Sequence, residues 1–177
     1  IGGKLALICG IAAIVLGFVN AVTEPVILQN KKEALEQAIT SVSGERGVGK
    51  QIIEDDLEGI EYYYEITGPD GGYIVKLIGT GYGGDMHILA GYHRDGEIFA
   101  VVLMDNQETP GLGKKAENPE YMDTFIGTGG DEPVPVQKDQ LPQDQADAIT
   151  GATITFIGLA QALELGSEFV TSMGEEE

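Results

Sequence analysis

The chain has 177 residues, and its 29 acidic side chains against 10 basic ones give a formal net charge of −19 at pH 7. This length accommodates one domain of ordinary size with an appendage. The charge excludes nucleic acid as a partner, because a polyanion binder needs a basic surface. The excess is steepest from Ala116 to Glu177, where Lys138 is the one basic residue beside thirteen acidic ones, and we interpret it as a solvated acidic surface.

The nineteen residues from Leu5 to Thr23 carry no charged side chain and predict a membrane span. At ~1.5 Å of rise per residue, a helix of that length covers ~28 Å, which crosses a hydrocarbon core. The alternative is a cleaved signal peptide, whose apolar region is shorter and ends in small residues at alternate positions. Because residues 20–23 fit that pattern poorly, we predict a transmembrane helix over residues 1–23.

The charges beside this span leave its orientation open. Lys4 favours a cytoplasmic N-terminus, whereas Lys31 and Lys32 lie close enough to the other end to count against it. The chain begins at Ile1 and not at a methionine, which leaves room for preceding residues whose charges would also count. Charge alone therefore does not decide the topology.

A helical linker is expected between the span and the domain. Pro25 follows the apolar run and should end it, and from Val26 to Ser41 the apolar residues recur roughly on one face of a helix. The glycine-containing stretch 44–49 should break this second helix. We predict a linker over residues 24–49 and a separate domain over residues 50–177.

The chain has few cysteine and histidine side chains with which to ligate a metal. The single cysteine, Cys9, lies in the apolar run, which excludes intrachain disulfides, cysteine-ligated iron–sulfur clusters and paired-cysteine zinc sites. His87 and His93 lie in strand-like sequence, without carboxylates at ligand spacing. We therefore predict no metal site.

The body of the chain alternates strand formers with turn residues. Four runs rich in β-branched and aromatic residues are joined by turns at residues 69–72 and at Asp95-Gly96. A short helix is expected over residues 118–125, and a longer one from Thr150 to about Leu165. These elements predict an α+β fold, an antiparallel β-sheet with helices packed at one face or end. The four expected strands, in meander order, cover residues 60–66, 73–78, 86–92 and 98–104.

Two glycine clusters, residues 79–84 and 109–113, suggest a ligand site. Gly79, Gly81 and Gly84 match the spacing of a dinucleotide-binding loop, but strand-like sequence follows where that loop needs a helix. The second cluster precedes two lysines, as a phosphate loop would, but lacks that loop's first glycine and its Ser or Thr. We expect both clusters to face a planar ligand, because glycine lets backbone amides approach closely. The alternative is two mobile turns.

A third motif, D-A-I-T-G-A-T, runs from Asp147 to Thr153. Such a stretch can simply open a helix, with Thr150 as the N-cap and small residues in the first turn. In that arrangement Thr153 lies in the first turn, where free N–H groups and the helix dipole favour an anion.

Taken together, these three motifs make the chain resemble a known family. They are Gly81-Tyr82-Gly83-Gly84, then Glu108-Thr109-Pro110-Gly111-Leu112-Gly113, then Asp147 to Thr153. The chain resembles the FMN-binding domain family found in the G subunit of the Rnf complex and the C subunit of the Na⁺-translocating NADH:quinone reductase. Its last motif matches D-x-x-[ST]-G-A-T, in which the final threonine is esterified to the phosphate of FMN. The short insertions between the motifs favour the G subunit.

Two positions depart from the family pattern. Asn106-Gln107 stands where a histidine is frequent, and Thr150 replaces the commoner serine. Neither departure removes the attachment threonine.

The resemblance implies FMN joined through its phosphate to the Thr153 hydroxyl, by a flavin transferase that uses FAD as the donor. Thr155 is the neighbouring alternative. Glu108 is expected to bond the ligand or loop amides, or else to cap the loop. Lys114 and Lys115 either stabilise reduced flavin, so that their replacement lowers its potential, or are ordinary surface lysines. The expected cofactor-binding residues are Thr153, Thr150, Gly151, Ala152, Gly81, Tyr82, Gly83, Gly84, Glu108, Thr109, Gly111, Leu112, Gly113 and Lys114.

The resemblance also implies a function. The chain is expected to be the redox-active G subunit of an Rnf-type ferredoxin:NAD⁺ oxidoreductase that transports Na⁺ or H⁺, without a catalytic acid–base pair of its own. Its expected partners are the other membrane and iron–sulfur subunits and the flavin transferase, with the FMN domain on the extracytoplasmic side of the cell membrane. The alternatives are the C subunit of the NADH:quinone reductase and a membrane-tethered binding or scaffold module without redox function.

Overall fold

The computed structural model describes residues 2–44, 46–54, 57–68, 71–111, 113–149 and 151–174. It divides into two units, Ile1–Gln37 and Ala38–Glu177. The first unit is helical throughout its described residues, which belong to helix α1 (Gly2–Ser43). Among the described residues, α1 is the one helix that is long and apolar enough to cross a membrane.

Helix α1 does not end where the sequence suggested. Pro25 lies inside the helix, which continues without a break to Ser43. Proline removes one backbone donor and so one i→i−4 hydrogen bond, and the residues on both sides favour helix. The expected break at Pro25 between the apolar run and the following helix is therefore absent, and α1 is one continuous helix.

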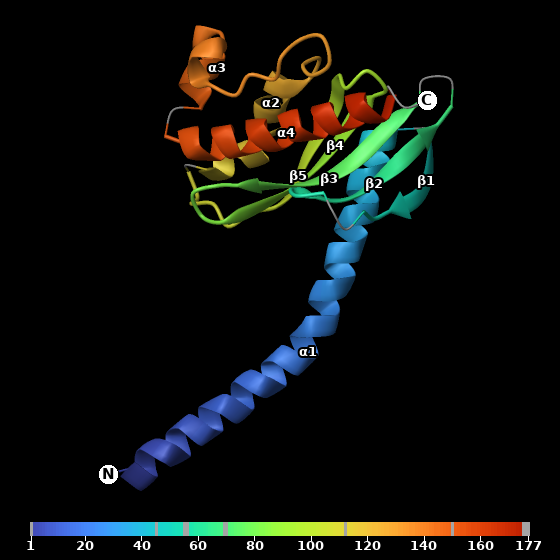
Figure 1. Ribbon diagram of the computed structural model, residues 1–177. Helices are drawn as coiled ribbons and strands as arrows, with labels where there is room; N and C mark the ends of the chain where they lie inside the picture. The colour runs from blue at the N-terminus through green and yellow to red at the C-terminus, as the bar shows by residue number, and fades with distance from the viewer. Residues whose placement is uncertain are drawn as a thin grey trace. The chain divides into compact units, whose positions relative to one another are not determined.

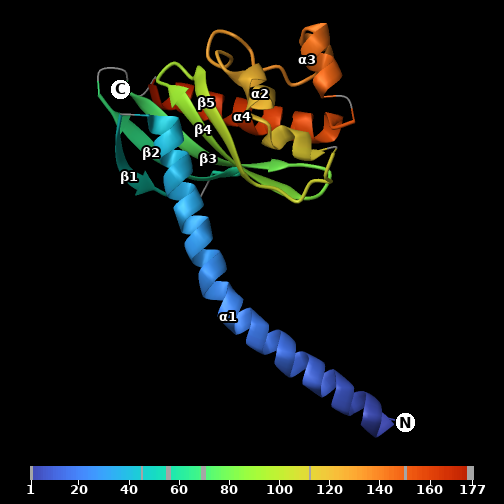
Figure 2. The same cartoon turned by 180° about the vertical axis from the view of Figure 1, so that it is seen from behind.

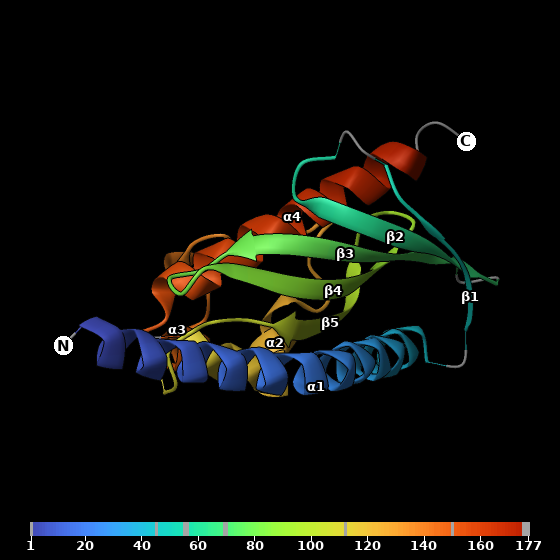
Figure 3. The same cartoon turned by 90° about the horizontal axis from the view of Figure 1, so that it is seen from below.

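The second unit is built on one antiparallel sheet, with the strands side by side in chain order β1-β2-β3-β4-β5 (Figure 3). The strands are β1 (Gly47–Ile52), β2 (Ile60–Thr67), β3 (Gly72–Thr80), β4 (Asp85–His93) and β5 (Ile98–Asp105). The four expected strands are all present, in the expected meander order. Strand β1 was missed, because two glycines and two polar residues hide it; it is a largely exposed edge strand with irregular pairing between Val48 and Gln51.

Helices cover both faces of this sheet. On one face α4 (Thr153–Gly174) crosses the strands (Figure 1), and its Phe156, Leu159 and Leu163 share a core with Val75 and Leu77 of β3. On the opposite face, the last turns of α1 pack Ala38 and Val42 against Ile66, Ile74 and Leu89 (Figure 2). The α+β class is confirmed. The last turns of the expected linker helix therefore form a layer of the domain on this face of the sheet, which explains why β3 is buried on both sides.

The beginning of α4 lies directly against the end of β3. A Cβ atom at Gly79 would come within 2.7 Å of the Gly158 carbonyl oxygen, and one at Gly158 would overlap the Thr80 carbonyl oxygen. Such an approach is available only to glycine at both positions. It brings the first turn of α4 beside the loop that joins β3 to β4.

The remaining elements are short and lie between β5 and α4. The expected helix over 118–125 is α2 (Pro119–Met122) followed by the 3₁₀ turn η2 (Asp123–Phe125), and the long helix begins at Thr153 and extends beyond Leu165 to Gly174. Of the expected turn at 69–72, Pro69 and Asp70 lie outside the described residues. The other short elements are the 3₁₀ turns η1 (Gly113–Glu117) and η3 (Lys138–Gln140) and helix α3 (Gln143–Ala148).

Candidate functional site

A pocket of about 350 Å³ lies at the N-terminus of α4. Three segments far apart in the sequence form its wall: the β3–β4 loop, the segment from β5 to η1, and the first turn of α4. The three motifs singled out in the sequence therefore meet at one place. The lining residues are Tyr82, Glu108, Thr109, Gly113, Gly151, Ala152, Thr153, Ile154 and Thr155.

A buried carboxylate joins the three segments. The Glu108 side chain is 4% exposed. Its Oε1 accepts a hydrogen bond from the Gly83 N–H at 2.9 Å, and its Oε2 accepts one from the Thr155 hydroxyl at 2.8 Å. We call Glu108, Gly83 and Thr155 the Glu108 clamp. Because a buried carboxylate without donors is costly, each of these bonds holds its segment in place.

Glycines make room for the clamp. A Cβ atom at Gly81 or Gly113 would overlap the Glu108 carboxylate, and one at Gly83 would overlap the Gln107 carbonyl oxygen. Gly81 also donates its N–H to the Gly84 carbonyl at 2.9 Å, in a turn where Gly84 has a φ of 128°. The glycines of the two clusters therefore make room for a buried carboxylate, and of the described ones only Gly113 lines the pocket itself.

The first turn of α4 presents two threonines in different environments. Thr153 is the first residue of the helix and is exposed at the pocket, whereas Thr155 is 1% exposed and donates to Glu108. Gly151 has a φ of 90°, a conformation that glycine adopts without strain, and its backbone turns the chain into the helix. The first N–H groups of a helix have no intrahelical acceptor, so this end attracts an anion.

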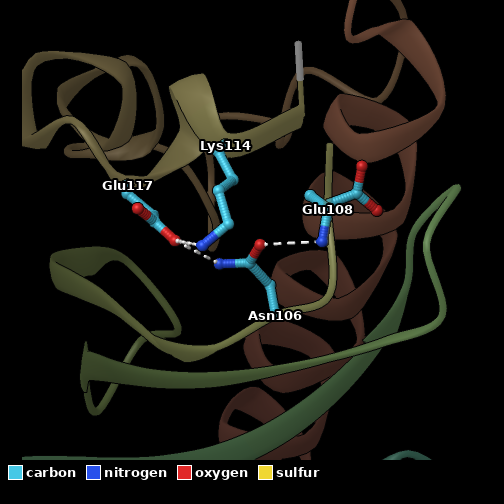
Figure 4. A network of polar contacts seen from close by, with 4 residues as sticks. All are labelled: Asn106, Glu108, Lys114 and Glu117. Atoms are coloured by element: carbon cyan, nitrogen blue, oxygen red, sulfur yellow. Dashed lines mark hydrogen bonds and ion pairs between the residues drawn. The ribbon is translucent and has the colours of Figure 1, made fainter. Parts of the chain in front are cut away.

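Lys114, expected at the cofactor, is held elsewhere. Its Nζ lies 2.9 Å from Glu117 Oε1, which also accepts a hydrogen bond from the Asn106 side chain at 3.0 Å. Asn106 Oδ1 in turn accepts the Glu108 backbone N–H, while the Glu108 carboxylate points away from Lys114 (Figure 4). The bonds from Lys114 and Asn106 lower the pKa of Glu117. Lys114 does not line the pocket.

Tyr121 carries a polar atom that the sequence did not single out. Its side chain packs edge-to-face on Phe156 at 6.5 Å between ring centroids, and its hydroxyl is buried without a hydrogen-bond partner among the described residues. Burial raises the pKa of the Tyr121 hydroxyl well above its usual range, and the negative charge of Glu108 raises it further. The hydroxyl therefore stays protonated beside the Glu108 clamp.

Of the twelve expected site residues that the structure describes, seven line this pocket. Gly111, with a φ of 81°, shapes its loop but does not line the pocket, and Leu112 and Thr150 lie outside the described residues. Sequence reasoning missed the clamping role of Thr155 and the lining role of Ile154. A signal for Thr155 exists: it shares the buried face of α4 with Phe156 and Leu159, where a hydroxyl needs a partner. The expected residues that do line the pocket are Tyr82, Glu108, Thr109, Gly113, Gly151, Ala152 and Thr153.

Comparison with known proteins identifies this region as a recognised domain. Residues 81–166 match the FMN-binding domain, and every residue that lines the pocket falls within that range. The G subunit of the Na⁺-translocating ferredoxin:NAD⁺ oxidoreductase complex of Acetobacterium woodii is 30% identical over 172 residues, covering 88% of this chain and 83% of the relative. The chain belongs to the G-subunit family of ion-translocating oxidoreductase complexes.

Two further relatives agree with this assignment. The G subunit of the ion-translocating oxidoreductase complex of Methanosarcina acetivorans is 29% identical, over 81% of this chain and 77% of its own length. The G subunit of the proton-translocating ferredoxin:NAD⁺ oxidoreductase complex of Clostridium ljungdahlii is 25% identical, over 96% of this chain and 89% of its own. With such relatives and, among the described residues, one long apolar N-terminal helix, the chain is a membrane-anchored member of the family.

The clamp predicts a difference between two substitutions at Thr155. Thr155→Val keeps the shape but leaves Glu108 Oε2 without its donor, which should reduce the free energy of unfolding by about 1–3 kcal/mol. Thr155→Ser keeps the hydroxyl and should cost less, and the comparison is made by urea unfolding of the full chain in detergent. Equal stability of the Val and Ser variants would contradict the clamp.

Proposed function

We propose that this chain is the electron-transferring G subunit of an ion-translocating ferredoxin:NAD⁺ oxidoreductase complex, with FMN esterified through its phosphate to Thr153. The observation that carries the proposal is the placement of an exposed threonine hydroxyl at a helix N-terminus, on the wall of a 350 Å³ pocket. The relatives named for such complexes support the choice of subunit.

The residues at the pocket fit a flavin phosphate. The free N–H groups at the start of α4 and the positive end of its dipole favour a phosphodiester anion next to Thr153. Gly151 and Ala152 keep the surroundings small, so that a modifying enzyme can reach the hydroxyl. The pocket volume lies within the range that ligand-sized sites occupy.

The same geometry favours Thr153 over Thr155 as the acceptor. The Thr155 hydroxyl is buried and already donates to Glu108, whereas Thr153 is exposed. In the reaction with FAD, a bond forms between Thr153 Oγ1 and the flavin-side phosphorus. The pyrophosphate P–O bond breaks, AMP leaves, and the hydroxyl proton is released. A separate flavin transferase catalyses this step.

Bound FMN supplies the one- and two-electron chemistry, and the protein supplies position and electrostatics. The ring of Tyr82 lines the pocket and is 76% exposed on the β3–β4 loop. Thr109 and Ile154 also line the pocket and would shield part of a bound cofactor from water. Electron transfer requires no proton donor or acceptor pair of the chain's own.

The other proposed functions receive less support. The relatives are named as G subunits, which argues against the C subunit of the NADH:quinone reductase. A scaffold without redox function would explain neither the match to the FMN-binding domain nor the pocket at Thr153. As a G subunit, the chain would assemble with membrane and iron–sulfur subunits of its complex.

We also propose that the FMN domain lies on the extracytoplasmic side. An alkaline phosphatase fused to the C-terminus should then be active in cells, because that enzyme folds only after export. A phosphatase fusion without activity, beside a fluorescent green fluorescent protein fusion at the same position, would place the domain in the cytoplasm.

The attachment residue is tested by three variants produced together with a flavin transferase. Thr153→Ala should lose the flavin-fluorescent band on a denaturing gel, because it lacks the hydroxyl that forms the ester. Thr153→Ser and Thr155→Ser keep both hydroxyls and should retain the band. Fluorescence that persists in Thr153→Ala would refute the assignment.

A further inference from the structure

The pocket wall carries one fixed charge. Among the described residues that line it, Glu108 is the only one with a charged side chain. That carboxylate is 4% exposed, so solvent screens it little. Its two hydrogen-bond donors are a backbone N–H and a hydroxyl, neither of which carries a charge.

Neither lysine of the same segment lies on the pocket wall, because Lys114 and Lys115 are both absent from its lining. Lys114 pairs with Glu117 at 2.9 Å, on the other side of Asn106 from the Glu108 carboxylate (Figure 4). That pair is partly exposed and sums to zero formal charge. The described pocket wall therefore presents a net negative charge.

A negative charge beside a flavin opposes its reduction, because reduction adds electrons to the ring system. Opposition of this kind is strong where water is excluded, since the effective dielectric constant falls from ~80 to ~20 or below. The charges placed around a bound flavin are among the means by which a protein sets its potential.

We propose that Glu108 is a redox-tuning residue, a buried carboxylate on the pocket wall that holds the potential of the bound FMN low. The inference rests on the proposed FMN site. From the sequence alone, Lys114 and Lys115 were instead the candidates for setting the flavin potential.

The clamp makes a neutral replacement feasible. In Glu108→Gln, the amide oxygen can still accept from the Gly83 N–H, and the amide nitrogen can donate to the Thr155 hydroxyl oxygen. Both contacts of the clamp are then kept in nearly the same shape, while the charge is removed. Thr155→Val does the reverse, because it keeps the charge and removes one contact.

The experiment is a redox titration of the full chain, loaded with FMN by a flavin transferase in detergent. Glu108→Gln should favour the reduced flavin by about tenfold at a given potential, which is about 30 mV for the two-electron couple. Thr155→Val should be less stable but should show no such rise in potential. Glu117→Gln, a charge removal away from the pocket wall, should leave the potential close to that of the parent chain.

Two results would overturn the assignment. One is a potential in Glu108→Gln that is unchanged or lower while the protein carries FMN. The other is FMN loading in Glu108→Asp but none in Glu108→Gln, because the charge would then serve to build the site and not to tune it. If the parent chain itself takes up no FMN, the proposed function fails and not this inference alone.

Discussion

The two hydrogen bonds of the Glu108 carboxylate hold the site together. Through them the segment after β5 binds both the β3–β4 loop and the first turn of α4, at 2.9 Å and 2.8 Å. At three positions around the clamp only glycine fits, because the carboxylate or the neighbouring backbone occupies the space that a Cβ atom would need. Removal of the clamp would release the segment after β5, which carries little regular structure of its own, whereas β3 and α4 would still meet at Gly79 and Gly158.

The same arrangement sets two opposing charges at one pocket. The N-terminus of α4 is electropositive and suits a phosphate at Thr153, whereas Glu108 is negative and faces the same space. A phosphate anchor and a redox-active ring are different parts of one cofactor, so a positive end for the first and a negative wall for the second are compatible. The large negative charge of the chain as a whole is a separate property, which affects solubility and the approach of partners.

Much of this site could be predicted from sequence, because its residues belong to short motifs with local causes. The motif that ends in Thr153 marks the start of a helix. Glu108 directly precedes the second glycine cluster, residues 109–113, which marks that segment as part of the site. Thr155 was underestimated because its role depends on a partner 47 residues away, which only the fold brings close. The pairing of Lys114 with Glu117 was foreseeable, since residues three apart in a helical turn face each other.

The fold was predicted less completely, and the misses have physical reasons. Strand β1 has an exposed edge position, where pairing with β2 and not side-chain burial stabilises it, so its composition carries no strand signal. Helix α1 passes Pro25 because one lost hydrogen bond is a small part of a helix of 42 residues. The burial of Ala38 and Val42 on the sheet could not be read from a segment that looked like a linker.

Attachment of FMN at one atom, the Thr153 hydroxyl oxygen, is the proposal on which the others depend. Mass spectrometry of peptides from the parent chain, produced together with a flavin transferase, tests it most directly. The peptide containing Thr153 should carry the mass of FMN less one water, and fragmentation should assign the added mass to Thr153. An unmodified peptide, or an adduct on Thr155 or elsewhere, would show that Thr153 is not the attachment residue.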